Sequence, residues 1–324
     1  MDDTYQRGPM LLLAGRANRP LAEEIGDLVG EASDSATIVD FADGEIFVRI
    51  DRNARGRDVF ILQPTSSPGD QILELLLLID AAKRASAARV CAVIPYYGYG
   101  RQDRKDQPRV AIGAKLMANL IVAAGADRVV GIDFHQHQIQ GFFDIPVDHL
   151  YAAPVLVRHF REKGLEDLVV VAPDVGSAKM ARGFARRLKS SFAIIDKRRL
   201  GPNRAEVLNV VGEVDGKTCL LVDDMVDTGG TLANAVVALK EKGAKAVHAT
   251  ASHALLSGPA VERLSVVPLE ELVVTNTIDV PEGRRFDKLR ILSVAGLLAD
   301  AIRFIHSNES VSALFETPEE GTRR

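Results

Sequence analysis

Short apolar runs alternate with helical patterns along most of the chain. The runs are rich in Val, Ile and Leu, which is typical of strands in parallel sheets that helices cover on both faces. Strands are predicted at residues 10–14, 37–41, 59–63, 90–94, 129–133, 168–172, 192–195, 218–222, 246–252 and 272–275. Helices are predicted at residues 71–85, 113–124, 152–163, 177–189, 231–242 and 296–306. This alternation predicts an α/β fold.

The same rhythm runs through both halves of the chain. A length of 324 residues favours two domains, since a domain commonly has about 150 residues. The boundary is predicted near residue 150, close to Pro146 and Pro154, so the expected domains are residues 8–150 and 151–316. The halves show no strict repeat, and the polar residues 317–324 are expected to form a disordered tail.

The composition excludes several classes of protein. Hydrophobic residues make up 47% of the chain, which argues against disorder. A net charge of -4 gives no broad attraction to nucleic acid or membranes, so neither is an expected partner. No apolar stretch resembles a signal peptide or a membrane span. Cys91 and Cys219 lie in apolar runs and are expected to be buried thiols of a cytoplasmic protein.

Six predicted strands end in polar, mostly ionisable clusters. Ligands of open α/β sheets bind outside the carboxyl ends of the strands. Polar residues at one strand end can be explained by exposure to solvent, whereas such residues at six strand ends favour a ligand site. The clusters are Asp43 with Glu45, residues 96–105, Asp133 with His135, Asp174, residues 196–199, and Asp223 with Asp224.

The most informative segment, residues 220–232, has the sequence LLVDDMVDTGGTL. Asp223 and Asp224 follow the predicted strand, and their carboxylates can accept sugar hydroxyls or bind a hydrated cation. The turn at residues 227–231 offers backbone N–H groups and two hydroxyls at a helix N-terminus, which suits a phosphate. An ordinary turn with exposed acids is the alternative. Two glycines flanked by threonines favour a site for a phosphorylated sugar.

Two further clusters suit a cation and a transferring phosphoryl group. Asp133 and His135 alternate along a strand end and are expected to point to one side. With Asp174 they would suit magnesium or manganese, although a lone histidine is more often structural, as His137 is expected to be. Residues 197–199, a basic triplet, could be a solvated loop. Facing acids and a phosphate, they could neutralise a phosphoryl group in transfer, with Lys197 and Arg199 on one face.

The stretch from residue 96 to 109 combines tyrosines, glycines and basic residues. It could stack a base and bind phosphates, and the acidic net charge disfavours a nucleic-acid ligand. Asp43, Gly44 and Glu45 alone are equally typical of a turn. The sequence contains neither a Gly-x-Gly-x-x-Gly motif nor a Gly-Lys-Thr loop, so ATP would bind by neither.

With these segments, the chain closely resembles the ribose-phosphate diphosphokinase family, also called phosphoribosyl diphosphate synthetases. The resemblance covers residues 11–315. It rests on FADGE at 41–45, VIPYYGYGRQDRK at 93–105, DFH at 133–135 with QIQGFFDIPVDHL ending at 150, APDVG at 172–176, IIDKRR at 194–199, VDDMVDTGGT at 222–231 and SVSALF at 310–315.

The resemblance implies that ATP and ribose 5-phosphate give phosphoribosyl diphosphate and AMP, for nucleotide biosynthesis, with Mg²⁺ as cofactor. It also implies two phosphoribosyltransferase-like domains, a homo-oligomer that is usually a hexamer, ATP held partly by the neighbouring subunit, and regulation by phosphate and ADP. The implied residues are Asp43, Gly44, Glu45, Arg101 and Gln102 for ATP; His135 and Asp174 for the metal; Lys197 and Arg199 for catalysis; Arg199, Asp223, Asp224, Asp227, Thr228, Gly229, Gly230 and Thr231 for ribose 5-phosphate; and Ser307, Ser310 and Ser312 for a regulatory phosphate.

Some residues depart from the family pattern. Residues 106–111 replace a more basic loop, Ser177 stands for a glycine and Met180 for an arginine. One alternative is a non-catalytic subunit of the same fold, but such a chain would be expected to lose Lys197 or His135. A phosphoribosyltransferase is another, yet it would leave residues 95–105 and 195–199 unexplained. The synthetase is therefore the favoured interpretation.

Overall fold

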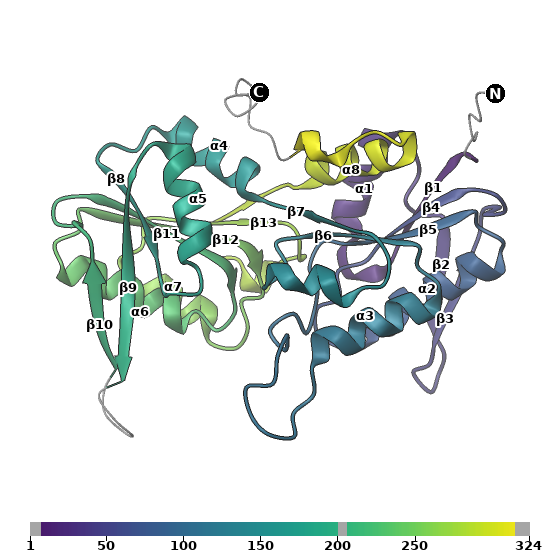
Figure 1. Ribbon diagram of the computed structural model, residues 1–324, viewed down its shortest axis with the longest axis horizontal. Coiled ribbons are helices and arrows are strands. Elements are labelled where there is room, and N and C mark those ends of the chain that lie inside the picture. The colour runs from purple at the N-terminus through teal and green to yellow at the C-terminus, as the bar shows by residue number, and fades with distance from the viewer. Residues whose placement is uncertain (1–7, 200–205, 315–324) are drawn as a thin grey trace. The chain divides into compact units, whose positions relative to one another are not determined.

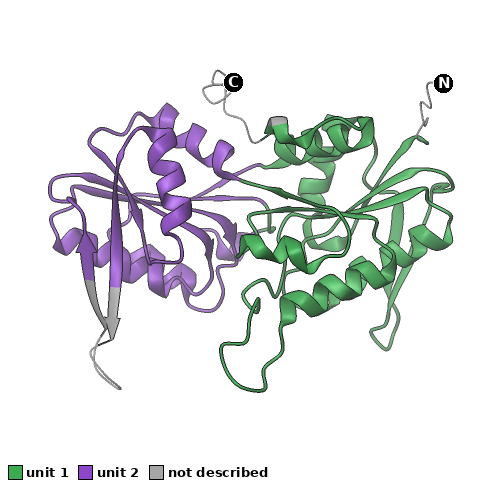
Figure 2. Ribbon diagram, viewed as in Figure 1, with its two compact units in different colours: residues 1–151, 277–279, 294–324 green, residues 152–276, 280–293 purple. Residues whose placement is uncertain are grey.

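The computed structural model describes residues 8–199 and 206–314, and it separates into two compact units (Figure 2). Unit 1 comprises Met1–Tyr151, Thr277–Asp279 and Val294–Arg324, and unit 2 comprises Ala152–Asn276 and Val280–Ser293. The tail predicted at residues 317–324 lies outside the described residues.

Unit 1 is built on a five-stranded sheet in the order β1-β4-β5-β6-β7 (Figure 1). All four of its strand pairs are parallel. A separate antiparallel pair, β2 with β3, forms a hairpin. The strands are β1 (Met10–Ala14), β2 (Ala36–Asp40), β3 (Ile46–Ile50), β4 (Asp58–Leu62), β5 (Arg89–Ile94), β6 (Arg128–Ile132) and β7 (Val147–Leu150); the helices are α1 (Arg19–Val29), α2 (Asp70–Arg84), α3 (Gly113–Ala124) and α8 (Ala295–Ser307), with 3-10 turns at Arg16–Asn18, His137–Phe142 and Val311–Leu314.

Helices cover both faces of this sheet. Buried side chains of α2 and α3 share one core with the strands, while α1 and α8 pack against each other. The end of α8 is fixed to the strands because His306 Nδ1 lies 2.9 Å from Asp58 Oδ2 and Arg89 donates to the Ile305 carbonyl oxygen at 3.1 Å. The division expected from the sequence left this helix in the second domain, whereas its packing belongs to unit 1.

Unit 2 is built on a seven-stranded sheet in the order β10-β9-β8-β11-β12-β13-β14. Its pairs are parallel except for β9 with β10, which is antiparallel. The strands are β8 (Leu168–Ala172), β9 (Ser191–Arg199), β10 (Glu206–Val211), β11 (Thr218–Val226), β12 (Ala246–Ala254), β13 (Leu272–Thr275) and β14 (Leu289–Leu292); the helices are α4 (Ala153–Lys163), α5 (Ala178–Leu188), α6 (Gly230–Glu241) and α7 (Ala260–Val266), with a 3-10 turn at Glu282–Arg284.

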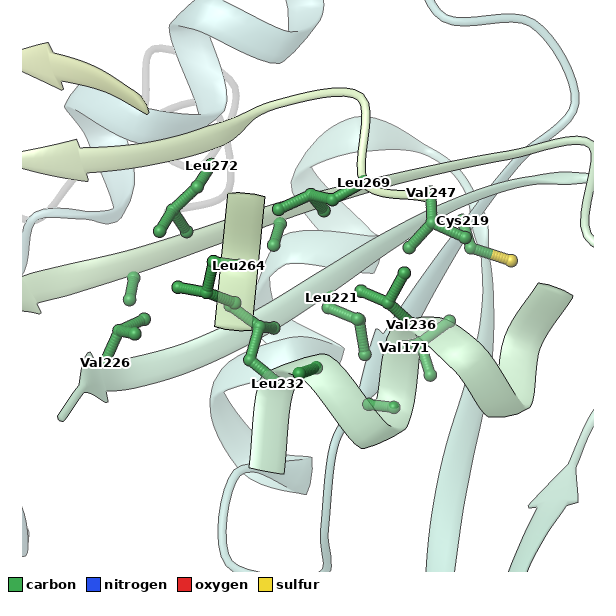
Figure 3. Packing of buried hydrophobic residues seen from close by; sticks show 14 of the residues in the cluster. Val171, Cys219, Leu221, Val226, Leu232, Val236, Val247, Leu264, Leu269 and Leu272 are labelled. Carbon is green, nitrogen blue, oxygen red and sulfur yellow. The ribbon is translucent and has the colours of Figure 1, made fainter. Parts of the chain in front are cut away.

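One core cluster of unit 2 lies between its sheet and the helices α6 and α7. Leu232 and Val236 of α6 and Leu264 of α7 pack among strand residues such as Leu221 and Val247 (Figure 3). Helix α5 contacts β8, β9 and β11, and no residue of α5 belongs to this core cluster. The prediction of an α/β protein with mostly parallel sheets flanked by helices is confirmed.

Local predictions held best where the apolar pattern was strong. The ranges of β1, β8, β13 and α3 agree with those expected from the sequence. The strand predicted at residues 37–41 was wrongly assigned to a parallel sheet, because it pairs with β3 in the antiparallel hairpin. Strands β3, β7, β10 and β14 and helices α1 and α7 were not predicted. Among the described residues, no helix is long and apolar enough to cross a membrane.

Candidate active site

Acidic side chains gather at the carboxyl end of the unit 2 sheet. Asp174 follows the last residue of β8, and the neighbouring strand β11 carries Asp223 and Asp224. The prediction that β11 ends at Val222 is wrong, because pairing with β12 continues to Val226. Both acids therefore stand within a hydrogen-bonded strand, which positions them more firmly than a loop does.

The electrostatics of Asp223 are unfavourable to its charge. Burial, followed by the nearby charges of Asp224 and Asp174, raises the pKa of Asp223 well above its ordinary value. The Asp224 N–H donates to Asp223 Oδ1 at 3.0 Å and opposes that shift only in part. Like charges brought together in this way are typical of a site that receives a cation or hydroxyl donors.

The turn at residues 227–231 leads directly into α6. Gly229 is the N-cap residue with φ of 71°, and a Cβ there would lie 3.3 Å from backbone atoms of Ala260. Both facts favour glycine. Gly229 has no side chain with which to cap α6, and the N-terminus of a helix suits an anion. The Thr228 carbonyl oxygen accepts from Arg263 Nη1 at 3.1 Å, which fixes the turn.

Asp174 is held by Ser177, three residues further along the chain. The Ser177 N–H donates to Asp174 Oδ1 at 3.1 Å. The Ser177 hydroxyl lies 3.2 Å from the Asp174 carbonyl oxygen and 3.3 Å from Oδ1. Ser177 is buried and has a negative φ of -85°. The residue that replaces the usual glycine is therefore unstrained and orients the carboxylate.

Lys197 and Arg199 lie within β9 and do not follow a strand as predicted. Lys197 pairs with Leu208 and Arg199 with Glu206 of β10. Strand β9 is longer than expected because the antiparallel partner β10 extends it.

In unit 1, the end of β6 turns sharply before His135. Asp133 is buried with φ of 40°, so the alternation expected for Asp133 and His135 does not hold. The Phe134 N–H donates to His149 Nε2 at 3.0 Å, and the two rings stack at 4.8 Å. His149 on β7 therefore holds the turn that carries His135. His137 packs on His149 at 5.2 Å between ring centroids, in keeping with a structural role.

The segment after β5 is more structural than its composition indicated. Tyr96 and Tyr97 are buried, whereas Tyr99 is 45% exposed. The Tyr97 hydroxyl donates to the Ala114 carbonyl oxygen at 2.8 Å, and burial raises the pKa of Tyr97. Of these three tyrosines, only Tyr99 is exposed enough to stack on a ligand.

Arg101 and Gln102 are exposed on the same segment. The Gln102 N–H donates to the Tyr99 carbonyl oxygen at 2.9 Å, and the Gln102 carbonyl oxygen accepts from the Ala114 N–H at 3.1 Å. These bonds fix the Gln102 backbone to α3 and leave both residues at the surface, as a ligand-binding role requires.

Asp43, Gly44 and Glu45 form the exposed turn of the β2–β3 hairpin. The Phe41 N–H donates to the Glu45 carbonyl oxygen at 2.8 Å, and the Glu45 N–H donates to Asp43 Oδ1 at 3.1 Å. This turn is not at the carboxyl edge of the parallel sheet, where the sequence analysis placed it. It is nevertheless ordered and open to a ligand.

The predicted residues thus divide into two sets. In unit 2, Asp174, Asp223, Asp224 and the turn at 227–231 stand at adjoining strand ends. In unit 1, His135, the segment at 101–102 and the hairpin turn come from three different places in the fold. Within the described part of the chain, no three His, Cys, Asp or Glu residues form a ready metal site. His149 and Arg16 were not predicted, because their hydrogen-bond partners Phe134, Asp40 and Glu74 are distant in sequence.

Both halves of the chain match families of known proteins. Residues 10–125 match the N-terminal domain of ribose phosphate pyrophosphokinase, and residues 198–316 match the phosphoribosyl synthetase-associated domain. The chain is 51% identical over 316 residues to a ribose-phosphate pyrophosphokinase of Clostridium tetani, covering 96% of this chain and 99% of the relative. Its identity to the corresponding protein of Bacillus subtilis is 50% over 316 residues, covering 97% and 100%.

The fold comparison agrees with these matches. The structure resembles the crystal structure of phosphoribosylpyrophosphate synthetase from Mycobacterium smegmatis with a TM-score of 0.88 and 46% identity. The similarity covers 93% of this chain and all of the other. The family resemblance found in the sequence is confirmed, and the chain belongs to the ribose-phosphate pyrophosphokinase family.

Proposed function

We propose that the protein transfers the β,γ-diphosphoryl group of ATP to ribose 5-phosphate, giving phosphoribosyl diphosphate and AMP. The anomeric hydroxyl oxygen forms a bond to the β-phosphorus and loses its proton. The bond from the β-phosphorus to the oxygen shared with the α-phosphorus breaks, and AMP leaves with that oxygen. The proposal assigns the acceptor to residues of unit 2 and the donor to residues of unit 1.

The observation that carries the proposal is the arrangement at the carboxyl end of the unit 2 sheet. Asp223 and Asp224 would accept the ribose hydroxyls, and the residues from Asp227 to Thr231 would bind the 5-phosphate. Burial and the charges of Asp224 and Asp174 raise the pKa of Asp223, and hydroxyl donors or a cation would offset this effect. The N-terminus of α6, entered through Gly229, suits a phosphate.

The donor is assigned to exposed residues of unit 1. Asp43, Gly44, Glu45, Arg101 and Gln102 would bind ATP. The two exposed segments that carry them are each fixed by backbone hydrogen bonds. Arg101 offers the planar guanidinium that suits phosphate oxygens.

Mg²⁺ is the proposed cofactor, with His135 and Asp174 as its ligands. The oxygen of Asp174 is oriented by Ser177, and the turn that carries His135 is held by His149. A cation also fits the repulsion among the three carboxylates of unit 2. When bound, Mg²⁺ would neutralise negative charge on the diphosphate.

Lys197 and Arg199 are the proposed catalytic residues, and Arg199 would also contact ribose 5-phosphate. The assignment is supported by their place on β9, which pairs in parallel with β8, the strand that leads to Asp174. Phosphoryl-type transfer depends on positioning and electrostatics, so a fixed cation is the group it needs most.

The remaining features of the family are also proposed for this chain. They are assembly into a homo-oligomer, expected to be a hexamer, and regulation by phosphate and ADP. The ATP-binding residues would belong to a domain at residues 8–150, and the ribose 5-phosphate site to a domain at residues 151–316. Ser307, Ser310 and Ser312 are the expected phosphate ligands. A cytoplasmic location is supported by two buried free thiols, Cys91 and Cys219.

The decisive experiment mixes purified protein with Mg²⁺, ATP, ribose 5-phosphate and phosphate. AMP and phosphoribosyl diphosphate should accumulate in equal amounts. Folded protein that produces no AMP above background would reject the proposal and favour a non-catalytic subunit. Consumption of phosphoribosyl diphosphate with a nucleobase, in the absence of its synthesis, would favour a phosphoribosyltransferase.

A further inference from the structure

Arg16, the first residue of the 3-10 turn after β1, contacts two other elements of unit 1, α2 and β2. Its Nε lies 2.6 Å from Glu74 Oε2 on α2. Its Nη1 and Nη2 donate to Asp40 Oδ2 and Oδ1 at 2.8 and 2.9 Å. Such a two-pronged pair fixes orientation as well as distance, because the guanidinium is planar and rigid.

The contact with Glu74 fixes Arg16 to the body of the unit. The Glu74 side chain is only 3% exposed. Its Oε1 also accepts from the Arg16 N–H at 2.5 Å and from Gln63 Nε2 at 3.0 Å. A buried carboxylate with several donors has little freedom to move, so the guanidinium of Arg16 is held in one direction.

The contact with Asp40 transfers this constraint to the β2–β3 hairpin. The hairpin forms its own two-stranded sheet, and Ile46 and Val48 of β3 pack on the core of unit 1. Ile38 of β2 also belongs to this core, but nearer the turn Val39 is 45% exposed and Phe41 is 53% exposed. Asp40, the last residue of β2, therefore provides a polar connection to the body just before the turn.

We propose that Arg16 is a positioning residue for the donor nucleotide, which acts through Asp40 on the turn at Asp43, Gly44 and Glu45. The inference rests on the proposed function, in which this turn binds ATP. Removing the connection leaves the hairpin folded, because its backbone pairing and the packing of β3 persist, but it frees the turn to reorient. ATP binding is then weakened, while the transfer step and the acceptor site are unaffected.

The test compares Asp40→Ala with the wild-type chain in steady-state AMP formation. We expect the KM for ATP to rise roughly three- to fivefold, the scale of an exposed but well-oriented ion pair. The kcat and the KM for ribose 5-phosphate should not change. Asp40→Glu, which retains the carboxylate, should recover part of the affinity.

Arg49→Ala is the matched control. Arg49 Nε lies 2.7 Å from Asp51 Oδ1 in an exposed ion pair. Arg49 is on β3 and Asp51 directly follows that strand, so the pair does not connect the hairpin to the body of the unit. Its loss should leave the KM for ATP unchanged. The double variant Arg16→Gln with Asp40→Ala should have the same KM as Arg16→Gln alone, since both changes break one connection.

Two failures can be told apart. A wild-type chain that forms no AMP rejects the proposed function, and the role of Arg16 falls with it. A wild-type chain that turns over normally, while Asp40→Ala has an unchanged KM for ATP, overturns the positioning role alone. A KM change shared equally by Arg49→Ala also overturns it, because the effect would then come from hairpin stability.

Discussion

At the two ends of the unit 2 sheet, the pKa of a partly buried carboxyl group is shifted in opposite directions. At the amino end of β13, Glu271 lies 2.7 Å from Lys163 Nζ and 3.1 Å from His248 Nδ1. Burial acts to raise the pKa of Glu271, but the hydrogen bonds from His248 and Lys163 lower it to about 2. At the carboxyl end of β11, burial and two neighbouring acids raise the pKa of Asp223.

This difference separates framework from site. Glu271 is supplied with partners from within the chain, so its charge stabilises the fold. The charge of Asp223 is opposed by its own neighbours, so the fold tolerates it at a cost in stability. Residues kept in an unfavourable state by the rest of a fold are typical of functional sites. Each of the following variants tests that division.

The largest effect is expected for Lys197→Ala. Its charge is needed mainly in the transition state, so turnover should fall by roughly 10²–10³-fold, while ATP binding largely survives. Arg198→Ala is the control, because the sequence pattern predicts that residue 198 points away from residues 197 and 199. Steady-state turnover and equilibrium ATP binding give the two readouts. An unchanged turnover number for Lys197→Ala would reject the catalytic role.

Asp223→Asn should separate activity from stability. The loss of a charged acceptor should lower kcat/KM for ribose 5-phosphate by about ten- to a hundredfold. At neutral pH the free energy of unfolding should rise, because the raised pKa means that ionising Asp223 destabilises the folded state. That gain should disappear as the pH falls below the ordinary Asp value of 3.8, because the carboxyl is then protonated in both states.

Asp167→Asn is a suitable control for this variant. Asp167 precedes β8 at the amino end of the sheet and its side chain is 70% exposed, with Lys217 Nζ at 3.3 Å. Replacing it should change neither activity nor stability appreciably. If Asp223→Asn is less stable than the wild-type chain at neutral pH, the contrast between the two ends of the sheet is wrong.

The contiguous part of the site could be predicted from the sequence. Residues 220–232 combine a strand, a turn and a helix start, and each has a local signal that needs no tertiary contact. The acids at Asp174, Asp223 and Asp224 were found for the same reason. The predicted end of β11 at Val222 was wrong, because pairing with β12 extends the strand to Val226 and no local signal shows this pairing.

The contacts that support the unit 1 residues could not be predicted in this way. Asp40 lies 24 residues from Arg16 along the chain, and Glu74 lies 58 residues from it. No periodicity links positions so far apart. The turn after β6 also escaped prediction, because the positive φ of Asp133 interrupts the alternation that a strand would follow. Its hydrogen-bond partner His149 carries no signal of its own.

Glu271→Gln tests the framework end of the comparison. The variant should lower the free energy of unfolding at neutral pH by about 1–3 kcal/mol. Lys163 and His248 would then face a neutral amide in place of the Glu271 carboxylate. The ordinary Glu value is 4.5 and the folded value is about 2, so the stabilisation is complete above 4.5 and is lost as pH falls toward 2. Denaturation measured across this range should show the difference shrinking, with activity at neutral pH retained.

The smallest effect is expected for Ser177→Ala. The variant loses the hydroxyl contacts to Asp174 at 3.2 and 3.3 Å and keeps the N–H donor at 3.1 Å. The loss of about 0.5–1.5 kcal/mol of hydrogen bonding should raise the Mg²⁺ concentration for half-maximal activity by a few fold. Ser190→Ala is the control, because Ser190 Oγ has no hydrogen-bond partner in the described part of the chain. If both variants respond to Mg²⁺ as the wild-type chain does, Ser177 does not orient Asp174 for a cation, and its burial is a matter of packing alone.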